Sequence, residues 1–166
     1  TLDRSSAASD VYKRQVNTEN ASDFARLKEI FAKDSLQMVT FTITEKGYSL
    51  VNGKGELLSD VEADFVSGPE APKSYIGKVA ALLYARYKAG EKPVAMVSMD
   101  NCSHNGDKLY AAINTFAEKW EENKLTDAGF RAYVNCKEKV TFPWTMIDKI
   151  TPVSYTHLTL PTSDLV

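Results

Sequence analysis

Apolar residues in the interior of the chain recur first with the spacing of a helix and then with the spacing of a strand. Between residues 22 and 33 they stand three or four positions apart, with lysines on the opposite side, which predicts an amphipathic helix. Ser22 or Asp23 is of the residue type that caps a helix N-terminus. Residues 38–44 are rich in β-branched and aromatic side chains and alternate apolar residues with threonines, which predicts a strand.

The chain then repeats this order of helix and strand. Residues 73–89 keep one apolar face, with Pro72 suited to the first turn and Gly90 to the C-terminus, so we expect a helix there. Residues 94–98 form a short apolar run, which is typical of a strand buried on both faces of a parallel sheet.

A further helix and a last strand complete the pattern. Residues 106–122 again show helical spacing after a loop at residues 99–105, and residues 140–142 predict a strand that Pro143 ends. The stretch from residue 47 to residue 72 is polar and contains several glycine turns, so we expect it to be irregular. Alternating helices and strands predict an α/β fold, with a doubly wound parallel sheet and helices on both faces.

The composition supports a single core and excludes several kinds of partner. The 166 residues are 43% hydrophobic and 25% charged, the ordinary balance of a globular domain. A net charge of -2 offers no basic surface for nucleic acid. No apolar run approaches the roughly 20 residues that cross a membrane, and Cys102 and Cys136 form no paired motif. We therefore expect a cytoplasmic protein without a nucleic-acid or membrane partner.

The two ends of the chain differ from its interior. Residues 1–15 and residues 153–166 carry no apolar period that could bury a face. The strings SAASDVYKRQ and VSYTHLTLPTS within them resemble translated sequencing-adapter or vector DNA. We expect both ends to be artefactual, disordered tails, with native tails as the alternative, and residues 16–152 to form the domain.

Polar residues follow the predicted strands. Ligands of parallel α/β sheets bind at the carboxyl ends of the strands, where this sequence has Thr44 and Glu45, Asp100 and Asn101, and Asp148 farther along. Taken singly, each cluster is typical of turn and capping residues. Their common placement at strand ends nevertheless indicates a binding site.

Three motifs strengthen this interpretation. Residues 41–48 read FTITEKGY, residues 98–106 read SMDNCSHNG, and residues 142–152 read FPWTMIDKITP. In order and spacing they resemble the long-chain mannitol dehydrogenase family, which includes mannitol 2-dehydrogenase and fructuronate reductase, also called mannonate oxidoreductase. The resemblance implies part of a Rossmann-type domain that binds NAD or NADP and acts with a small-molecule polyol or sugar-acid substrate.

The resemblance also implies that parts of the enzyme are missing. No G-x-G-x-x-G turn for the cofactor pyrophosphate occurs in the chain, so we expect the first βαβ unit to be absent. The family's catalytic lysine belongs to a C-terminal helical domain that would follow Pro152. The chain is therefore expected to be an inactive fragment of a metal-independent, hydride-transferring oxidoreductase.

Individual residues receive roles from the same resemblance. Asn101 matches the family's oxyanion-stabilising asparagine, and we assign it catalysis and substrate binding. Asp148 matches a residue that contacts substrate hydroxyls, Ile147 one that contacts the nicotinamide, and Thr44 and Glu45 would lie beside the cofactor.

Alternatives stay open at this level. Asn101 could simply close a turn, and Asp148 could pair with Lys149 or a helix N-terminus. Cys102 and His104 replace the leucine and proline usual in the family and, with Asp100, raise a weaker zinc hypothesis. A non-catalytic α/β binding or regulatory domain is the competing function. The choice between mannitol/fructose and mannonate/fructuronate, and between NAD and NADP, is open.

Overall fold

A computed structural model of the chain describes residues 16–147. The sequence-based predictions for residues 1–15, for residues 153–166 and for Asp148 lie outside the described residues.

Three parallel strands form the sheet, in the order β1 (Met38–Phe41), β2 (Val94–Ser98) and β3 (Val140–Thr141). Phe41 pairs with Ser98, and Val94 pairs with Val140, so β2 lies in the centre. The apolar run of β2 accounts for this position, because four of its five residues are buried. The predicted α/β fold with a parallel sheet is confirmed.

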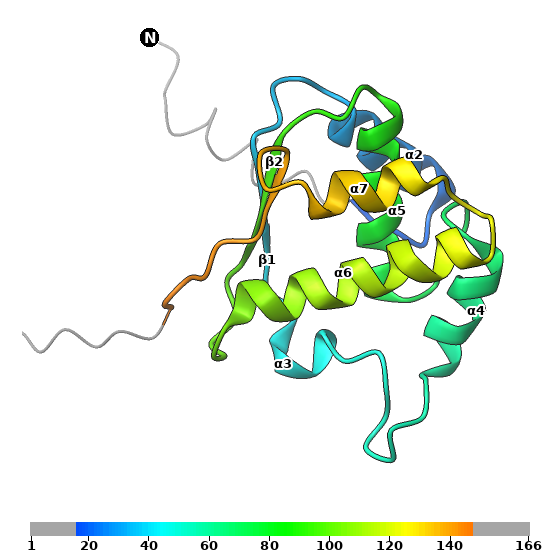
Figure 1. Cartoon of the computed structure of the whole chain (residues 1–166), viewed down its shortest axis with the longest axis vertical. Helices are drawn as coiled ribbons and strands as arrows, with labels where there is room; N and C mark the ends of the chain where they lie inside the picture. Colours follow the sequence, from blue (N-terminus) through cyan, green and yellow to red (C-terminus); the bar gives the residue numbers. More distant parts are fainter. Residues whose placement is uncertain (1–15, 148–166) are drawn as a thin grey trace, which may run out of the picture.

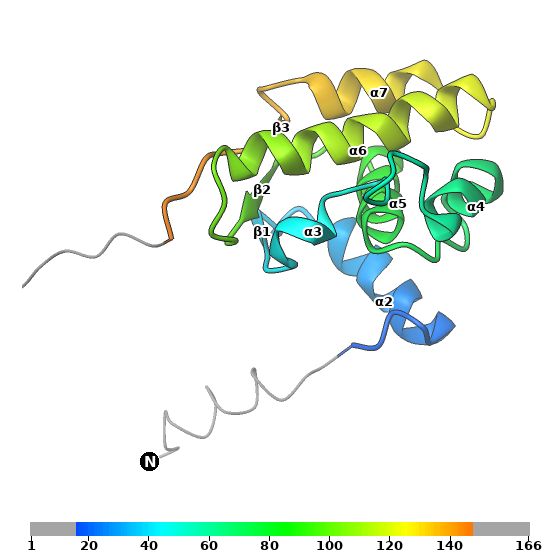
Figure 2. The ribbon, with the colours of Figure 1, turned by 90° about the horizontal axis from the view of Figure 1, so that it is seen from below.

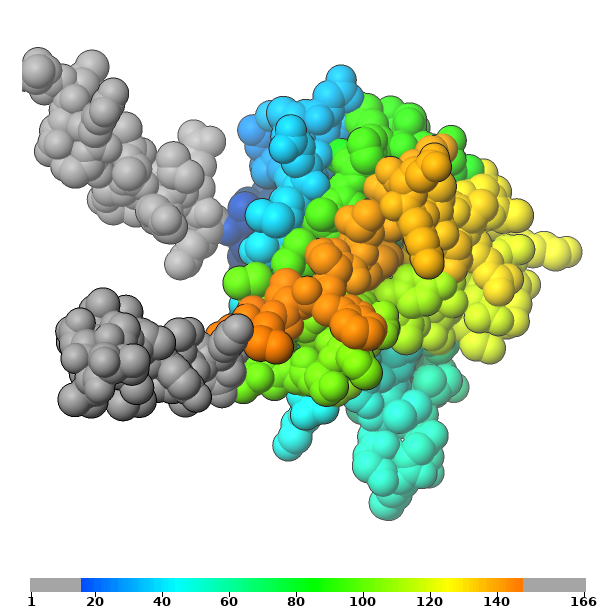
Figure 3. All heavy atoms as spheres, turned by 60° about the vertical axis from the view of Figure 1, so that its left-hand side comes forward, coloured from blue at the N-terminus to red at the C-terminus, as the bar shows by residue number. Residues whose placement is uncertain are grey.

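The helices pack beside this sheet. They are α2 (Ala21–Phe31), α3 (Thr44–Gly47), α4 (Ser59–Ser67), α5 (Tyr75–Lys88), α6 (Asn105–Glu122) and α7 (Ala128–Asn135). The described helices lie on one side of the strands (Figure 1), and α6 and α7 run side by side (Figure 2). On the opposite side Met38 and Thr40 of β1 are exposed, and strand segments reach the surface there (Figure 3). The second helical layer of a doubly wound sheet is thus not among residues 16–147.

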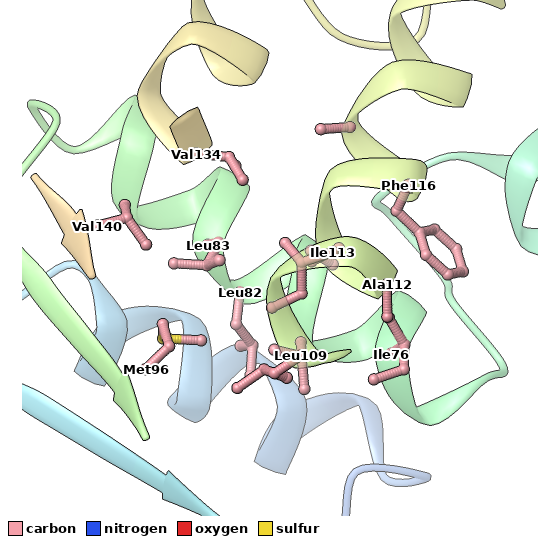
Figure 4. Close-up of a cluster of buried hydrophobic side chains, with 14 of the residues drawn as sticks. Ile76, Leu82, Leu83, Met96, Leu109, Ala112, Ile113, Phe116, Val134 and Val140 are labelled. Carbon is pink, nitrogen blue, oxygen red and sulfur yellow. The ribbon is translucent and has the colours of Figure 1, made fainter. Parts of the chain in front are cut away.

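The core lies between the sheet and these helices. Its buried apolar side chains come from α2, α4, α5, α6 and α7 and from all three strands, and Figure 4 shows a part of this cluster. The labelled members are Ile76, Leu82, Leu83, Met96, Leu109, Ala112, Ile113, Phe116, Val134 and Val140. Their helical and strand spacing in sequence is what brings them to one face.

One fully buried arginine joins the segments at the amino end of the sheet. The Arg86 guanidinium of α5 donates to the carbonyl oxygens of Phe31 and Leu36 at 2.6 and 2.8 Å, and to that of Pro93 at 2.6 Å. Since α2 ends before β1 here and α5 ends before β2, these bonds fix where both strands begin. One side chain thus supplies donors to backbone carbonyl oxygens at the end of α2 and just before β1 and β2.

Several local predictions were wrong. The cap of α2 is Asn20, whose side chain accepts from the backbone N–H of Ser22, rather than Ser22 or Asp23. The first strand ends at Phe41 instead of residue 44, because the following residues turn into α3. Pro72 precedes α5 instead of occupying its first turn, and Ser74 is the cap.

Two longer helices were not predicted. The stretch expected to be irregular contains α4, and α7 follows the loop after α6. In α4 the buried Asp64 stands beside Val61 and Phe65, which interrupts the apolar pattern in the sequence. Its carboxylate accepts from the backbone N–H groups of Lys73 and Ser74, so this polar residue prepares the start of α5.

Candidate functional site

Three loops meet at the carboxyl edge of the sheet. The loop after β1 leads into α3, the loop after β2 spans residues 99–104, and residues 142–147 follow β3. The loop before α6 lies between α3 and the segment after β3 (Figure 2). This is the edge at which parallel α/β sheets bind ligands.

A cavity of about 420 Å³ opens between the second and third loops. Residues 100–104 line one side and residues 144–147 line the other, so Asn101 and Ile147 border the same space. The His104 ring lies against Trp144, with ring centroids 4.3 Å apart. The volume falls within the range of small-ligand pockets, on the order of 300–1,000 Å³.

Asp100, next to Asn101, connects this loop to the one after β1. Its buried carboxylate accepts from the backbone N–H of Ile43 at 2.9 Å and of Thr44 at 2.8 Å, and from the Tyr48 hydroxyl. Burial works to raise the pKa of Asp100, but the hydrogen bonds from Ile43, Tyr48 and Thr44 together hold it below its ordinary value. Asp100 is therefore an anion in the folded protein.

Tyr48 and Ser98 extend the same network. Their hydroxyl oxygens lie 2.5 Å apart, and both side chains are buried. Burial and the neighbouring Asp100 carboxylate raise the pKa of Tyr48 well above its usual range. The Tyr48 hydroxyl consequently keeps its proton and serves as a donor to Asp100.

Asn105 ties the other end of the loop to the segment after β3. Its side-chain amide donates to the Thr145 hydroxyl at 2.7 Å and to the Asp100 carbonyl at 3.1 Å, while its amide oxygen accepts from Thr145 N–H at 3.1 Å. Gly106 permits this close approach, since a Cβ there would stand 2.5 Å from the Phe142 carbonyl oxygen. The residues after β3 are thus held against the start of α6.

Glu45 lies in a different place. Its carboxylate is 2.5 Å from Lys108 Nζ, and both residues line a separate hollow between α3 and α6. The hydrogen bond and charge of Lys108 lower the pKa of Glu45. Thr44, at φ 65°, is linked to the Asn101 loop by its N–H bond to Asp100.

The structure thus brings two of the five predicted site residues to one cavity. Asn101 and Ile147 share it, Thr44 adjoins it through Asp100, Glu45 borders another hollow, and Asp148 lies outside the described residues. The network residues Tyr48, Ser98 and Asn105 received no role from sequence. All three stand within the quoted motifs, which was the available signal.

The geometry gives no support to the zinc hypothesis. The Asp100 carboxylate is engaged by Ile43, Thr44 and Tyr48. Within residues 16–147, no three histidine, cysteine, aspartate or glutamate side chains converge on a point that could hold a metal ion.

None of the helices in this range is long and apolar enough to cross a membrane.

Comparison with known proteins decides the family. The sequence profile described as "Mannitol dehydrogenase Rossmann domain" matches residues 1–166. The chain belongs to the mannitol dehydrogenase family. The resemblance drawn from the three motifs, and the Rossmann-type fold it implied, are confirmed.

Relatives within the mannitol dehydrogenase family include enzymes of both substrate types. A D-mannonate oxidoreductase of Thermotoga maritima is 47% identical over 130 residues, which cover 78% of this chain and 24% of the relative. A mannitol 2-dehydrogenase of Cereibacter sphaeroides is 34% identical over 139 residues, which cover 82% of this chain and 27% of the relative. The chain therefore spans about a quarter of the length of these relatives.

A solved structure agrees with the fold. The crystal structure of a D-sorbitol dehydrogenase in substrate-free form superposes with a TM-score of 0.60 at 28% identity, covering 84% of this chain and 28% of that one.

Proposed function

We propose that this chain is part of the Rossmann domain of a longer NAD(P)-dependent dehydrogenase that interconverts a sugar acid and its keto form, of the mannonate/fructuronate type. The family match supports the dehydrogenase class. Identity of 47% to a D-mannonate oxidoreductase against 34% to a mannitol 2-dehydrogenase favours the acid substrate. The observation that carries the proposal is the presentation of Asn101 beside Ile147 in one cavity at the carboxyl edge of the sheet.

The residues of this cavity suit one end of a dinucleotide. Ile147 and Trp144 offer an apolar wall and Asn101 a hydrogen-bonding amide, a combination that fits a flat nicotinamide ring next to a hydroxylated chain. Thr44 and Glu45, at the start of α3, would border the cofactor on the side of β1. The sequence has no glycine-rich turn for the pyrophosphate, so that contact would come from outside this chain. A bound nicotinamide dinucleotide would supply or accept the hydride.

Asn101 would act on the substrate oxygen. In reduction, the carbonyl carbon receives a hydride and its oxygen a proton, so C=O becomes CH–OH, and negative charge develops on oxygen in between. An amide N–H aimed at that oxygen stabilises the transition state, and removing one such donor costs about 2.7–4 kcal/mol. Asp148 would hold hydroxyls of the substrate by accepting their hydrogen bonds. This mechanism uses no metal ion.

Steady-state assays of a full-length protein containing residues 16–147 would test the proposal. We expect NAD(P)H oxidation with fructuronate at a higher kcat/KM than with fructose, and activity that survives treatment with EDTA. Fructose as the better substrate would instead assign the mannitol type. Loss of activity with EDTA and its return with zinc would overturn the metal-free mechanism, and no oxidation with either substrate would overturn the dehydrogenase.

A further inference from the structure

The loop that carries Asn101 is anchored by a residue to which the proposed mechanism gives no role. Asp100 immediately precedes Asn101, and only 6% of its surface is exposed. A buried carboxylate costs free energy unless donors compensate it. Its three donors, Ile43 N–H, Thr44 N–H and the Tyr48 hydroxyl, all belong to the segment after β1.

These donors lie at both ends of α3. Ile43 occupies the position before the helix and has no polar side chain to cap it. The Asp100 carboxylate, from the neighbouring strand, takes the place of such a cap. Tyr48 follows the last residue of α3 and reaches the same carboxylate with its hydroxyl. One anion therefore fixes both ends of the helix.

The backbone at this point needs such support. Thr44 has φ 65°, in the left-handed region that a residue with a branched Cβ avoids. A hydrogen bond of 2.8 Å from its N–H to Asp100 Oδ1 holds it there. A weaker acceptor would allow this turn, and α3 with it, to relax.

On this basis, and resting on the proposed function, we propose that Asp100 is a positioning residue: its carboxylate locks α3 to the loop of Asn101, and thereby sets the oxyanion donor relative to the cofactor side of the site. Misplacement of a reacting group by about 1 Å can cost on the order of 100-fold in rate. Because Asp100 and Asn101 share a peptide bond, movement of one displaces the other.

A kinetic double-mutant cycle in the full-length protein tests this coupling. Asp100→Asn keeps the shape of the side chain but removes its charge and one acceptor oxygen. We expect it to lower kcat about tenfold when Asn101 is present and by less than about twofold in the Asn101→Ala background, since coupled residues are non-additive. The KM for the cofactor should rise several-fold. Asp107→Asn, at an exposed carboxylate in the first turn of α6, is the matched control and should change neither.

Equal losses of kcat in both backgrounds would show a general effect on stability and overturn the proposal, as would an unchanged kcat in Asp100→Asn. Should Asp100→Asn not fold, Tyr48→Phe removes one donor and keeps the carboxylate, and the same cycle should give the same non-additivity at smaller size.

Hydrogen exchange in the 166-residue chain separates this inference from the proposed function. Asp100→Asn should accelerate exchange of the backbone amides of residues 43–48 and leave those of α5 unchanged. That result would support the link between Asp100 and α3 even if the full-length protein reduced no sugar. In that case the proposed function alone would fail, and Asp100 would position the loop of a different kind of site. Unchanged exchange at residues 43–48 would overturn the lock itself.

Discussion

Asp100 and Asn101 are neighbours in sequence with opposite surroundings. Asp100 is buried and bound by three donors, whereas Asn101 is exposed at the rim of the cavity. The buried Asp100 anion fixes the backbone at this point. The motif S-x-D-N thus contains a buried anchor followed by an exposed residue.

The charge of Asp100 leads to a prediction about acid stability. Its pKa is lowered in the folded chain, so the unfolded chain, with a value of about 3.9, binds the proton more readily. The stabilisation is therefore fully present above about pH 5 and is lost as pH falls through about 4 toward the folded pKa. In urea unfolding, the stability advantage of the unsubstituted chain over Asp100→Asn should be constant near neutral pH and shrink in acid. An advantage independent of pH would contradict this.

At the scale of elements, the periodicity of apolar residues predicted the helices and strands whose buried side chains form one continuous apolar face. Helices α2, α5 and α6 and the central strand β2 were placed within one or two residues. Helix α3 is a single turn stabilised by a carboxylate some 56 residues away, and α4 buries Asp64 within its apolar face. Neither feature leaves a local signal, because the partner that makes it favourable lies in another part of the chain.

The same reason limits what the motifs could say about the site. They placed the predicted site residues at the carboxyl edge of the sheet, and they contained Tyr48, Ser98, Asp100 and Asn105. That these four form the framework between the loops depends on tertiary hydrogen bonds, such as the one from Asn105 to Thr145. Strand alternation alone would also have continued β1 to residue 44, where Asp100 instead turns the chain.

The junction of α6 with the segment after β3 allows a test at this scale. Gly106→Ala would place a Cβ 2.5 Å from the Phe142 carbonyl oxygen and 2.6 Å from that of Pro143, both backbone atoms. We expect a loss of about 1–3 kcal/mol in the free energy of unfolding, measured by urea denaturation of the 166-residue chain. Gly53→Ala is the control, since no atom lies within 4 Å of its added Cβ. Equal effects of the two substitutions would show that the close approach at Gly106 is not tight.

At the scale of the whole molecule, the described chain holds one helical layer and three strands of a larger arrangement. Its relatives are about four times longer, and its sequence has no glycine-rich pyrophosphate turn. On the proposed function, the cavity beside Asn101 would contact only a small part of the dinucleotide, and the remaining binding energy would come from other residues of the longer protein.

Dinucleotide binding by the 166-residue chain should accordingly be weak. Isothermal titration calorimetry with NADH should show no saturable binding at micromolar concentrations, while the full-length protein should bind in that range. Tight binding of NADH by the 166-residue chain would mean that its own residues contact the pyrophosphate in place of a glycine-rich turn. The proposal that this contact comes from other residues of the longer protein would then be wrong.

The central claim, that Asn101 stabilises developing charge on the substrate oxygen of a sugar-acid dehydrogenase, is tested most directly by Asn101→Ala in the full-length protein. Steady-state reduction of fructuronate should show kcat lowered roughly 100-fold or more with little change in KM, because the lost hydrogen bond is stronger in the transition state than in the ground state. An Asn101→Ala enzyme that kept nearly full kcat would contradict the account and leave Asn101 as a residue that merely forms the turn after β2.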